Sequence, residues 1–328
     1  MGQQSPSYLT DLVDLHLHLG SASTPHFLWE LAHEQGIKLA EKDYWAFIKS
    51  ITLKEQTSYD KYLAFFHVTE LIQSSTYAVE RSMHKAVSRA YRKGNIQTLE
   101  VRFNPMLRNK GGAHDLDKII FGALVGMKHA CLEYPVKAGL IVMMDRRFPK
   151  EQNLIIAQKA ARFASEGVVG IDIAGPITKD FHVSDLVDAV KVARDAGLKV
   201  TIHTGEVTGA DEMWEVVRLL KPDRIGHGIH CVDDPKLMAH LKQQHIVLEV
   251  CPTSNLQTSA VKTWDEMSTV IQTLKTHGVP FTINSDGPEL LGINVREEFE
   301  TLLEKNILTV DDVIACTNTA KAATFIRG

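Results

Sequence analysis

Histidines and carboxylates follow several apolar runs of this 328-residue chain, at positions where a packed core does not need them. Burying such groups costs free energy unless they are paired or bound to a metal. A hydrolytic metal centre does need them, because it combines nitrogen and oxygen ligands, a nearby proton carrier and an open coordination position. The motifs concerned are His16-Leu17-His18, His203-Thr204-Gly205-Glu206, Gly226-His227-Gly228 and Asn284-Ser285-Asp286.

The first histidine pair could bind one metal ion. His16 and His18 stand two residues apart in a strand-like run, so their side chains project to the same side. A pair of this kind also occurs by chance or on a solvated strand. The metal-binding hypothesis is stronger here because the other three motifs lie at the ends of later strand-like runs. In a parallel barrel the carboxyl ends of the strands converge on one mouth.

Each of the other motifs offers a different group. His203 is a third nitrogen ligand, and Asp286 supplies a carboxylate ligand. Glu206 follows a glycine that permits a sharp turn, which places it near the reacting group; the alternative is a solvated loop carboxylate. His227 lies between two glycines, so another group can approach it closely; the alternative is a hydrogen-bonded core histidine. Such a site suits zinc better than iron or manganese, and a bound water would have its pKa lowered toward about 7.

The elements that must position these motifs alternate along the chain. Helical segments, among them residues 153–166, 183–196 and 235–244, separate eight strand-like runs. This alternation predicts a parallel sheet with helical crossovers, and eight repeats without a dinucleotide-binding glycine motif favour a closed (β/α)8 TIM barrel. The strand-like runs are residues 12–19, 97–103, 138–145, 168–174, 199–203, 224–228, 246–251 and 280–286.

Polar and apolar residues alternate within these runs and so separate two faces of each strand. An antiparallel sheet with one wet face would show the same pattern. The helical segments favour the barrel, with its apolar residues outward under the helices and its polar residues inward. The outward set is Val13, Leu15, Leu17, Leu19, Leu99, Val101, Phe103, Phe281 and Ile283; the inward set is Asp14, His16, His18, Glu100, Arg102, Thr282, Asn284 and Asp286.

Residues 24–94 are too many for a simple strand-to-helix connection and predict a helical insertion after the first strand. Thr24 and Pro25 indicate a helix start, and Gly36 indicates its end. Long insertions are usually lids or binding loops. The alternative is that the aromatic residues of segment 58–74 pack a small core of the insertion itself. The apolar residues concerned are Tyr62, Leu63, Phe65, Phe66, Val68 and Leu71.

Composition excludes several functions. The hydrophobic content of 44% supports a large core, and the net charge of -4 indicates neither nucleic acid nor an anionic membrane as partner. The four cysteines form no CxxC pair, which indicates a reducing compartment and excludes the PCxxC zinc site that cytidine and nucleic-acid-base deaminases use. The first residues lack the features of a signal peptide. We expect a single domain over residues 1–328, cytoplasmic, acting on a small molecule; the sequence indicates no particular oligomeric state.

Seven motifs, taken in order, resemble the adenosine deaminase-like branch of the amidohydrolase superfamily. The resemblance extends over essentially the whole chain. It implies a zinc-dependent (β/α)8 barrel that hydrolyses the amino group of aminopurines. The motifs are HLHL (16–19) with Pro25 downstream, EVRFNP (100–105), GIDIAG (170–175), HTGE (203–206), RIGHG (224–228), EVCPTSN (249–255) and NSDGP (284–288).

The same resemblance implies a role for individual residues. Glu206 would protonate the ring nitrogen beside the carbon under attack. His227 would orient and stabilise the hydroxide, with help from Asp286. Gly175 would let the backbone approach the purine ring. One zinc ion per chain would be bound by His16, His18, His203 and Asp286.

Two positions depart from the family pattern. Gly20 stands where the family usually has an acidic residue associated with the sugar of a nucleoside, and Gly287 where it has a second aspartate contacting the purine's imidazole nitrogen. Adenosine would therefore lose two anchors, so we expect it to be a poor substrate. Glu289 could reach inward in place of the missing aspartate. The alternative is that neighbouring residues or waters compensate and adenosine remains the substrate.

Two other functions are compatible with a metal-binding barrel. One is hydrolysis of another small-molecule bond, such as an amide, ester or phosphoester. Against it, Ala174 and Gly175 stand where binuclear relatives carry a bridging lysine. The other is a non-catalytic member that binds a purine or a partner protein. The retained metal and proton-transfer residues argue against it, and ammonia release from aminopurines distinguishes all three.

Overall fold

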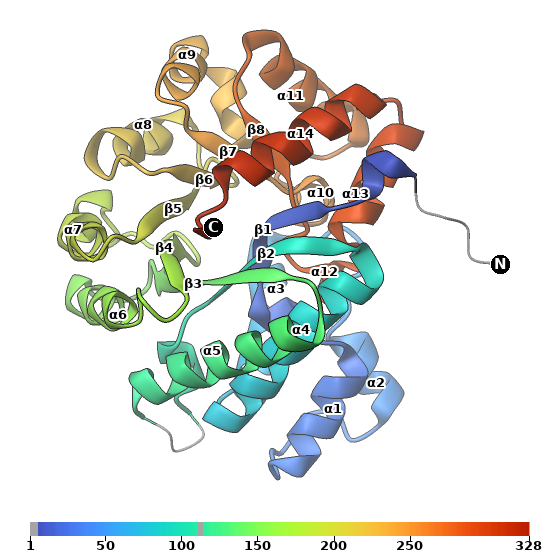
Figure 1. The fold of residues 1–328 in the computed structure, drawn as a ribbon, viewed down its shortest axis with the longest axis vertical. Coiled ribbons are helices and arrows are strands. Elements are labelled where there is room, and N and C mark those ends of the chain that lie inside the picture. The colour runs from blue at the N-terminus through green and yellow to red at the C-terminus, as the bar shows by residue number, and fades with distance from the viewer. Residues whose placement is uncertain (1–5, 111–113, 328) are drawn as a thin grey trace.

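The computed structural model describes residues 6–110 and 114–327 (Figure 1). Residues 1–5, which the signal-peptide argument used in part, lie outside the described residues. Eight parallel strands pair in chain order, each with the next, which confirms the predicted barrel. They are β1 Leu12–His18, β2 Ile96–Phe103, β3 Lys137–Asp145, β4 Val168–Ala174, β5 Lys199–Thr204, β6 Arg224–His227, β7 Val247–Val250 and β8 Phe281–Ile283.

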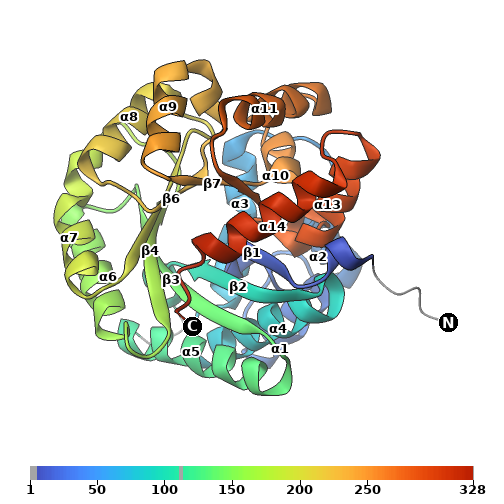
Figure 2. The same cartoon turned by 45° about the horizontal axis from the view of Figure 1, so that its top comes forward.

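Helices surround the strands on the outside, as Figures 1 and 2 show. Four of them, α1–α4, lie between β1 and β2 and form the predicted insertion. None of the described helices is both long and apolar enough to cross a membrane. The helices are α1 Pro25–Glu34, α2 Tyr44–Ser50, α3 Tyr59–Ile72, α4 Thr76–Gly94, α5 Leu116–Glu133, α6 Lys150–Arg162, α7 Val187–Asp195, α8 Ala210–Leu219, α9 Pro235–Gln243, α10 Pro252–Gln257, α11 Trp264–His277, α12 Pro288–Leu291, α13 Val295–Glu304 and α14 Val310–Ala323.

The predicted boundaries differ from the structure in a few places. Helix 153–166 begins earlier, after Pro149, and ends at Arg162. Segment 183–196 divides into a 3₁₀ turn followed by α7. The last strand is shorter than predicted and ends at Ile283; beyond it, Asp286 has a left-handed backbone conformation with φ 57°.

A parallel β-bridge between Leu17 and Asp286 closes the barrel. Asp286 donates its backbone N–H to the carbonyl of His16 at 2.8 Å, and its own carbonyl accepts from the N–H of His18 at 2.9 Å. The last strand segment is thereby joined to the first. The consequence for the site is direct, because the joint fixes Asp286 beside the histidine pair of β1.

The strand faces of β2 lie as predicted, but β1 departs from regular alternation, because its pairing with β2 shifts in register between Asp14 and Leu17. The prediction that Asp14 faces inward is wrong: Asp14 pairs with the outward Leu99 and lines an outer hollow with Leu17 and residues of α4. Val13 and Leu15, predicted to lie with Leu17 on the outward face, pack against α14 in a separate cluster. The apolar residues of β2 join the main core.

Inside the barrel the buried Arg102 contacts Asp172 and Glu249. Ion pairs join buried polar side chains from several strands there, and they fill the barrel below the mouth.

The insertion begins as predicted, because the Thr24 hydroxyl caps α1 by accepting from the backbone of Phe27 at 3.2 Å. Its aromatic residues have both predicted roles: they border a cavity, and they pack in a small core of the insertion. Tyr62 and Phe66 of α3 line a cavity at the barrel mouth, and they also belong to a small apolar cluster with residues of α12. Figure 2 shows α3 at one end of the barrel. Helix α3 is therefore both part of a local core and a wall of the cavity.

Candidate active site

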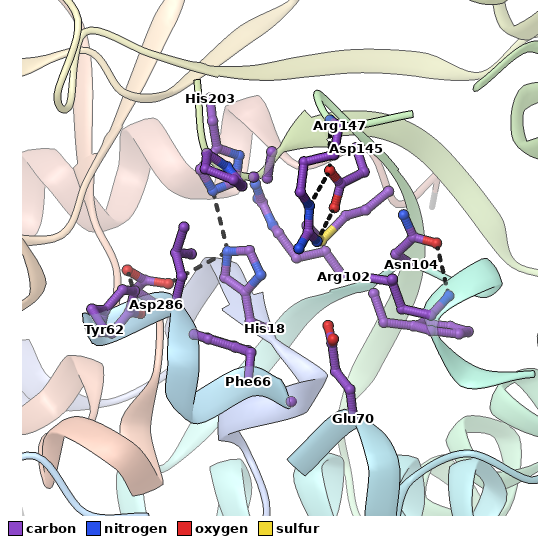
Figure 3. A pocket seen from close by; sticks show the side chains of 18 of the residues that line it. His18, Tyr62, Phe66, Glu70, Arg102, Asn104, Asp145, Arg147, His203 and Asp286 are labelled. Carbon is purple, nitrogen blue, oxygen red and sulfur yellow. Dashed lines mark hydrogen bonds and ion pairs between the residues drawn. The ribbon is translucent and has the colours of Figure 1, made fainter. Parts of the chain in front are cut away.

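A cavity opens at the carboxyl ends of the strands, where barrel enzymes carry their chemistry. It encloses about 730 Å³, with open solvent at its mouth included. Its lining combines strand ends with residues of α3 (Figure 3). The residues singled out from sequence that line it are His18, Gly20, Gly175, His203, Glu206, His227 and Asp286.

Three imidazole rings meet at the floor of this cavity. Nε2 of His18 lies 3.3 Å from Nε2 of His16 and 3.2 Å from Nε2 of His203. Oδ1 of Asp286 lies 3.4 Å from the same His18 nitrogen and 3.9 Å from Nε2 of His16. Figure 3 shows His18 between His203 and Asp286. The structure thus brings together all four residues predicted as metal ligands.

Buried carboxylates orient two of these rings. Nδ1 of His16 lies 2.8 Å from Glu249, and Nδ1 of His203 lies 2.9 Å from Asp172. A carboxylate accepts a hydrogen bond, so we assign the ring proton to each Nδ1, and each Nε2 presents a lone pair to the centre. Burial, with the nearby charge of Arg102, holds the pKa of both rings well below its usual value. Neutral histidines with their lone pairs converging are the arrangement that binds a divalent metal.

Glu249 remains ionised although it is fully buried. Burial alone would raise its pKa, but the guanidinium groups of Arg102 and Arg224 outweigh that effect and hold the pKa at about 2. Its second oxygen accepts from the hydroxyl of Thr201 at 2.9 Å. The carboxylate that orients His16 is therefore itself held in place by charge and hydrogen bonds.

A second set of atoms could also be considered for a metal. His16, His227, Cys251 and Asp286 place ligand atoms within 4.8 Å of one another. Burial, reinforced by nearby carboxylates, raises the pKa of the Cys251 thiol well above its usual value, so it stays protonated. A protonated thiol is a poor ligand, and the three converging imidazoles form the better donor set.

Glu206 and His227 lie side by side at the edge of this cluster. Oε2 of Glu206 is 3.6 Å from Nε2 of His227. Burial, together with the charge of Asp286, raises the pKa of Glu206 to about 8, so this carboxyl carries a proton at neutral pH. Burial lowers the pKa of His227 to about 4. The Asn255 amide lies 3.0 Å from Nδ1 of His227 and donates to it, which leaves Nε2–H as the donor facing the cavity.

Gly175 borders the cavity in a backbone conformation that favours glycine, with φ +99°. A Cβ at this position would lie 2.8 Å from Oδ1 of Asp145. The chain can therefore carry no side chain here without displacing that carboxylate. The family resemblance implies that the backbone here approaches the purine ring, and this role stays a prediction.

At Gly20 and Gly287, the two positions that depart from the family pattern, other side chains occupy the space beside the glycine. A Cβ at Gly20 would lie 2.8 Å from the ring of Phe66 and 3.4 Å from the guanidinium of Arg108. At Gly287 a Cβ would lie 3.0 Å from the Ser21 hydroxyl, and Tyr62 has its hydroxyl 3.5 Å away. Space for a larger side chain is absent at both positions.

The hypothesis that Glu289 reaches into the cavity is wrong. Its carboxylate accepts from Nη2 of Arg89 at 3.1 Å. Both residues line a different hollow, next to α4 and α12. The ion pair with Arg89 holds this carboxylate away from the mouth of the barrel.

Sequence reasoning missed several functional residues. Asp172 and Glu249 lie within motifs that were recognised, and the strand alternation that placed Arg102 inward would have found Asp172 as well. Glu70 and Asn104 also line the cavity. No sequence signal marked Glu70, because its position depends on how α3 crosses the barrel mouth.

A barrel with a polar cavity at the carboxyl ends of its strands is an architecture that many enzymes use, and similarity to known proteins identifies the class. The family model described as adenosine deaminase matches residues 12–327. An adenosine deaminase from Vibrio atlanticus is 32% identical over 304 residues, which is 92% of this chain and 90% of that protein. This chain belongs to the adenosine deaminase family, and with it to the aminopurine deaminases, hydrolases that act on C–N bonds.

Solved structures agree in fold. An adenine deaminase from Arthrobacter aurescens superposes with a TM-score of 0.87 at 22% identity, covering 97% of this chain and 94% of that chain. An amidohydrolase from Burkholderia ambifaria, solved with bound zinc, gives a TM-score of 0.86 at 21% identity over 100% of this chain and 90% of that chain. A complex of ADAL with IMP gives 0.84 at 23% identity, over 98% of this chain and 93% of that chain.

Proposed function

We propose that this chain releases ammonia from an adenosine- or adenine-like aminopurine, with one zinc ion held by His16, His18, His203 and Asp286. One observation carries the proposal. Tetrahedral zinc with Zn–N distances of about 2.0–2.1 Å places its nitrogen ligands about 3.3 Å apart, and the Nε2 atoms around His18 are separated by 3.2 and 3.3 Å. The amidohydrolase from Burkholderia ambifaria binds zinc, which supports this metal.

Each remaining residue has a defined task in the reaction. Zinc, when bound, lowers the pKa of a coordinated water toward about 7 and so supplies a nucleophile at neutral pH. His227 donates its Nε2–H to the attacking oxygen and orients it, together with Asp286. Glu206 is protonated at neutral pH because of its burial and delivers that proton to the ring nitrogen beside the amino-bearing carbon. The oxygen of water bonds to this carbon; one proton of that water restores the proton given up by Glu206 and the other passes to the amino group, so that the C–N bond breaks, a carbonyl remains and ammonia leaves.

The cavity supports a purine-sized substrate. The ring of Phe66 and the backbone at Gly175 border it, and they offer an apolar face and a close main-chain approach to a flat heterocycle. Relatives carry names of adenosine and adenine deaminases. Both names fit a small-molecule aminopurine as the substrate of this chain.

Ammonia release tests the proposal. Zinc-loaded protein is assayed with adenosine, adenine and other aminopurines, and with amide, ester and phosphoester substrates as controls. We expect ammonia from at least one aminopurine and no hydrolysis of the control bonds. Absence of ammonia from every aminopurine, with zinc bound, would overturn the proposed function.

A further inference from the structure

The end of the cavity next to Gly20 carries polar side chains that the proposed deamination does not use. Glu70 comes from the last turn of α3, and Asn104 follows β2; both line the cavity. Figure 3 shows the Glu70 carboxylate directed into the cavity. Buried polar groups without a local task indicate a ligand that satisfies them.

Asn104 holds a free hydrogen-bond donor. Its Oδ1 accepts from the backbone N–H groups of Met106 at 2.8 Å and Leu107 at 3.3 Å, which fixes the orientation of the amide. The opposite atom, Nδ2, is buried and has no hydrogen-bond partner in the described part of the chain. An unpaired buried donor is unfavourable, so a ligand that accepts a hydrogen bond from Nδ2 binds more tightly.

Glu70 holds free acceptor capacity. It is only 8% exposed, and its nearest cation is Nη1 of Arg108 at 3.7 Å, beyond hydrogen-bonding distance. Arg108 instead donates to the backbone carbonyl of Asn104 at 3.2 Å and to Gln73 at 3.3 Å. Among the described residues, no side chain or backbone N–H donates to the Glu70 carboxylate.

Charges of both signs lie at this end of the cavity. Glu70 faces Arg108, and the carboxylate of Asp145 accepts two hydrogen bonds from the guanidinium of Arg147, at 2.8 and 2.6 Å. Two carboxylates face two guanidinium groups there, and Lys110 adds one positive charge near Glu70, so the comparison of adenosine with AMP tests for a phosphate directly. A hydroxyl group, which both donates and accepts, matches the acceptor of Glu70 and the donor of Asn104.

We propose that Glu70 and Asn104 bind a hydroxyl group on the sugar of an aminopurine nucleoside, in place of the side chain absent at Gly20. The position supports this, because a Cβ at Gly20 would meet Phe66, one turn before Glu70, and Arg108, which faces Glu70. The inference rests on the proposed function. It reverses the expectation from sequence that adenosine is a poor substrate, because α3 supplies an anchor that the β1 motif lacks.

Kinetics on a graded set of substrates test the proposal. The kcat/KM is measured for adenosine, its 2′-, 3′- and 5′-deoxy forms, adenine and AMP. For the wild type we expect adenosine to exceed adenine, AMP and one of the deoxynucleosides by about tenfold or more. Glu70→Gln should lower the adenosine value about tenfold while the value for that deoxynucleoside stays within about twofold. The proposal would be overturned if Glu70→Gln lowered kcat/KM equally for adenosine and for that deoxynucleoside. It would also be overturned by a wild type with a higher kcat/KM for AMP than for adenosine.

Two further variants separate recognition from folding. Asn104→Asp keeps the Oδ1 acceptor of the turn but replaces the free donor with a charged acceptor oxygen, so it should also lose the preference for adenosine. Asp60→Asn changes an exposed carboxylate on α3, the helix that carries Glu70. It should leave the ratios of kcat/KM between the substrates unchanged. If Asn104→Asp and Asp60→Asn behave alike, Asn104 does not bind the sugar.

Binding measurements keep this proposal distinct from the proposed function. Calorimetry compares inosine with hypoxanthine, which differ only by the sugar and need no turnover. Glu70→Gln should raise the Kd of inosine about tenfold and leave the Kd of hypoxanthine almost unchanged. A protein that deaminates nothing but shows this difference would contradict the proposed function alone, whereas equal weakening of both ligands contradicts the role of Glu70.

Discussion

Burial determines the protonation states of single residues at the mouth of the barrel. It raises the pKa of Glu206 to about 8 and lowers that of His227 to about 4. At neutral pH the carboxyl group therefore carries a proton, and the imidazole is neutral. Groups whose pKa values are moved apart in this way are suited to separate acid and hydrogen-bonding roles.

Replacement of Glu206 tests its role as proton donor. Glu206→Gln keeps the size and polarity of the side chain but has no transferable proton. General acid–base groups contribute about 10²–10⁴-fold, so we expect kcat to fall by at least about 10²-fold with unchanged metal content. Glu215→Gln, at an exposed position, is the matched control. Turnover near the wild-type value in Glu206→Gln would assign the proton transfer to another group.

The pKa of Glu206 also predicts the pH dependence of the rate. A carboxyl group with a pKa of about 8 is protonated below that pH and ionised above it. As an acid it is therefore active at neutral pH, and kcat/KM should decline above about pH 8, approaching tenfold per pH unit. The residual rate of Glu206→Gln should lack this decline. A wild-type profile that stays level up to about pH 9.5 would contradict the assignment.

Among the elements, a buried ionic network joins the strands below the site. Glu249 of β7 contacts Arg102 of β2 and Arg224 of β6, as well as His16 of β1. Removing one partner from a buried network leaves charge uncompensated and costs about 3–5 kcal/mol.

Glu249→Gln should therefore lower the free energy of unfolding by about 3–5 kcal/mol, measured by urea denaturation. The change leaves two buried guanidinium groups with less negative charge to compensate them. Glu133→Gln, in an exposed pair with His84, is the control and should shift the midpoint little. Equal effects of the two substitutions would show that the barrel network does not stabilise the fold.

For the molecule as a whole, the proposed zinc site connects the first strand of the barrel to the segment that follows its last strand. Its donors come from β1, from β5 and from the segment after β8 that closes the barrel. A ligand that binds only the folded state stabilises it by about 2.7 kcal/mol at 100 times its Kd.

Elemental analysis of purified protein should find about one divalent ion per chain, chiefly zinc. Removal by a chelator should lower Tm, and added zinc should restore it. His18→Ala should lose this response, because it removes the nitrogen at the centre of the cluster. A Tm of the wild type that does not respond to chelation and zinc would contradict the site.

Patterns within the sequence were sufficient to predict the barrel, the four candidate ligands and Glu206. Period-two alternation in β2 separates inward from outward residues, and this separation follows from local strand geometry. In β1 the alternation is interrupted between Asp14 and Leu17, and the sequence pattern did not reveal this. Because parallel strand ends meet at one mouth, motifs far apart in the chain could be assigned to one site. Gly20 and Gly287 were likewise visible as departures from the family pattern.

The surroundings of those residues depend on how distant segments pack, and the sequence did not predict them. The left-handed turn at Asp286 joins the last strand to His16 and His18, and no pattern in the sequence indicated this turn. The space beside Gly20 is filled by Phe66, and Glu70 stands nearby, because α3 packs across the mouth. Strand alternation is a property of neighbouring residues, whereas these contacts join segments distant in the chain, whose relative position is fixed only when the whole core packs.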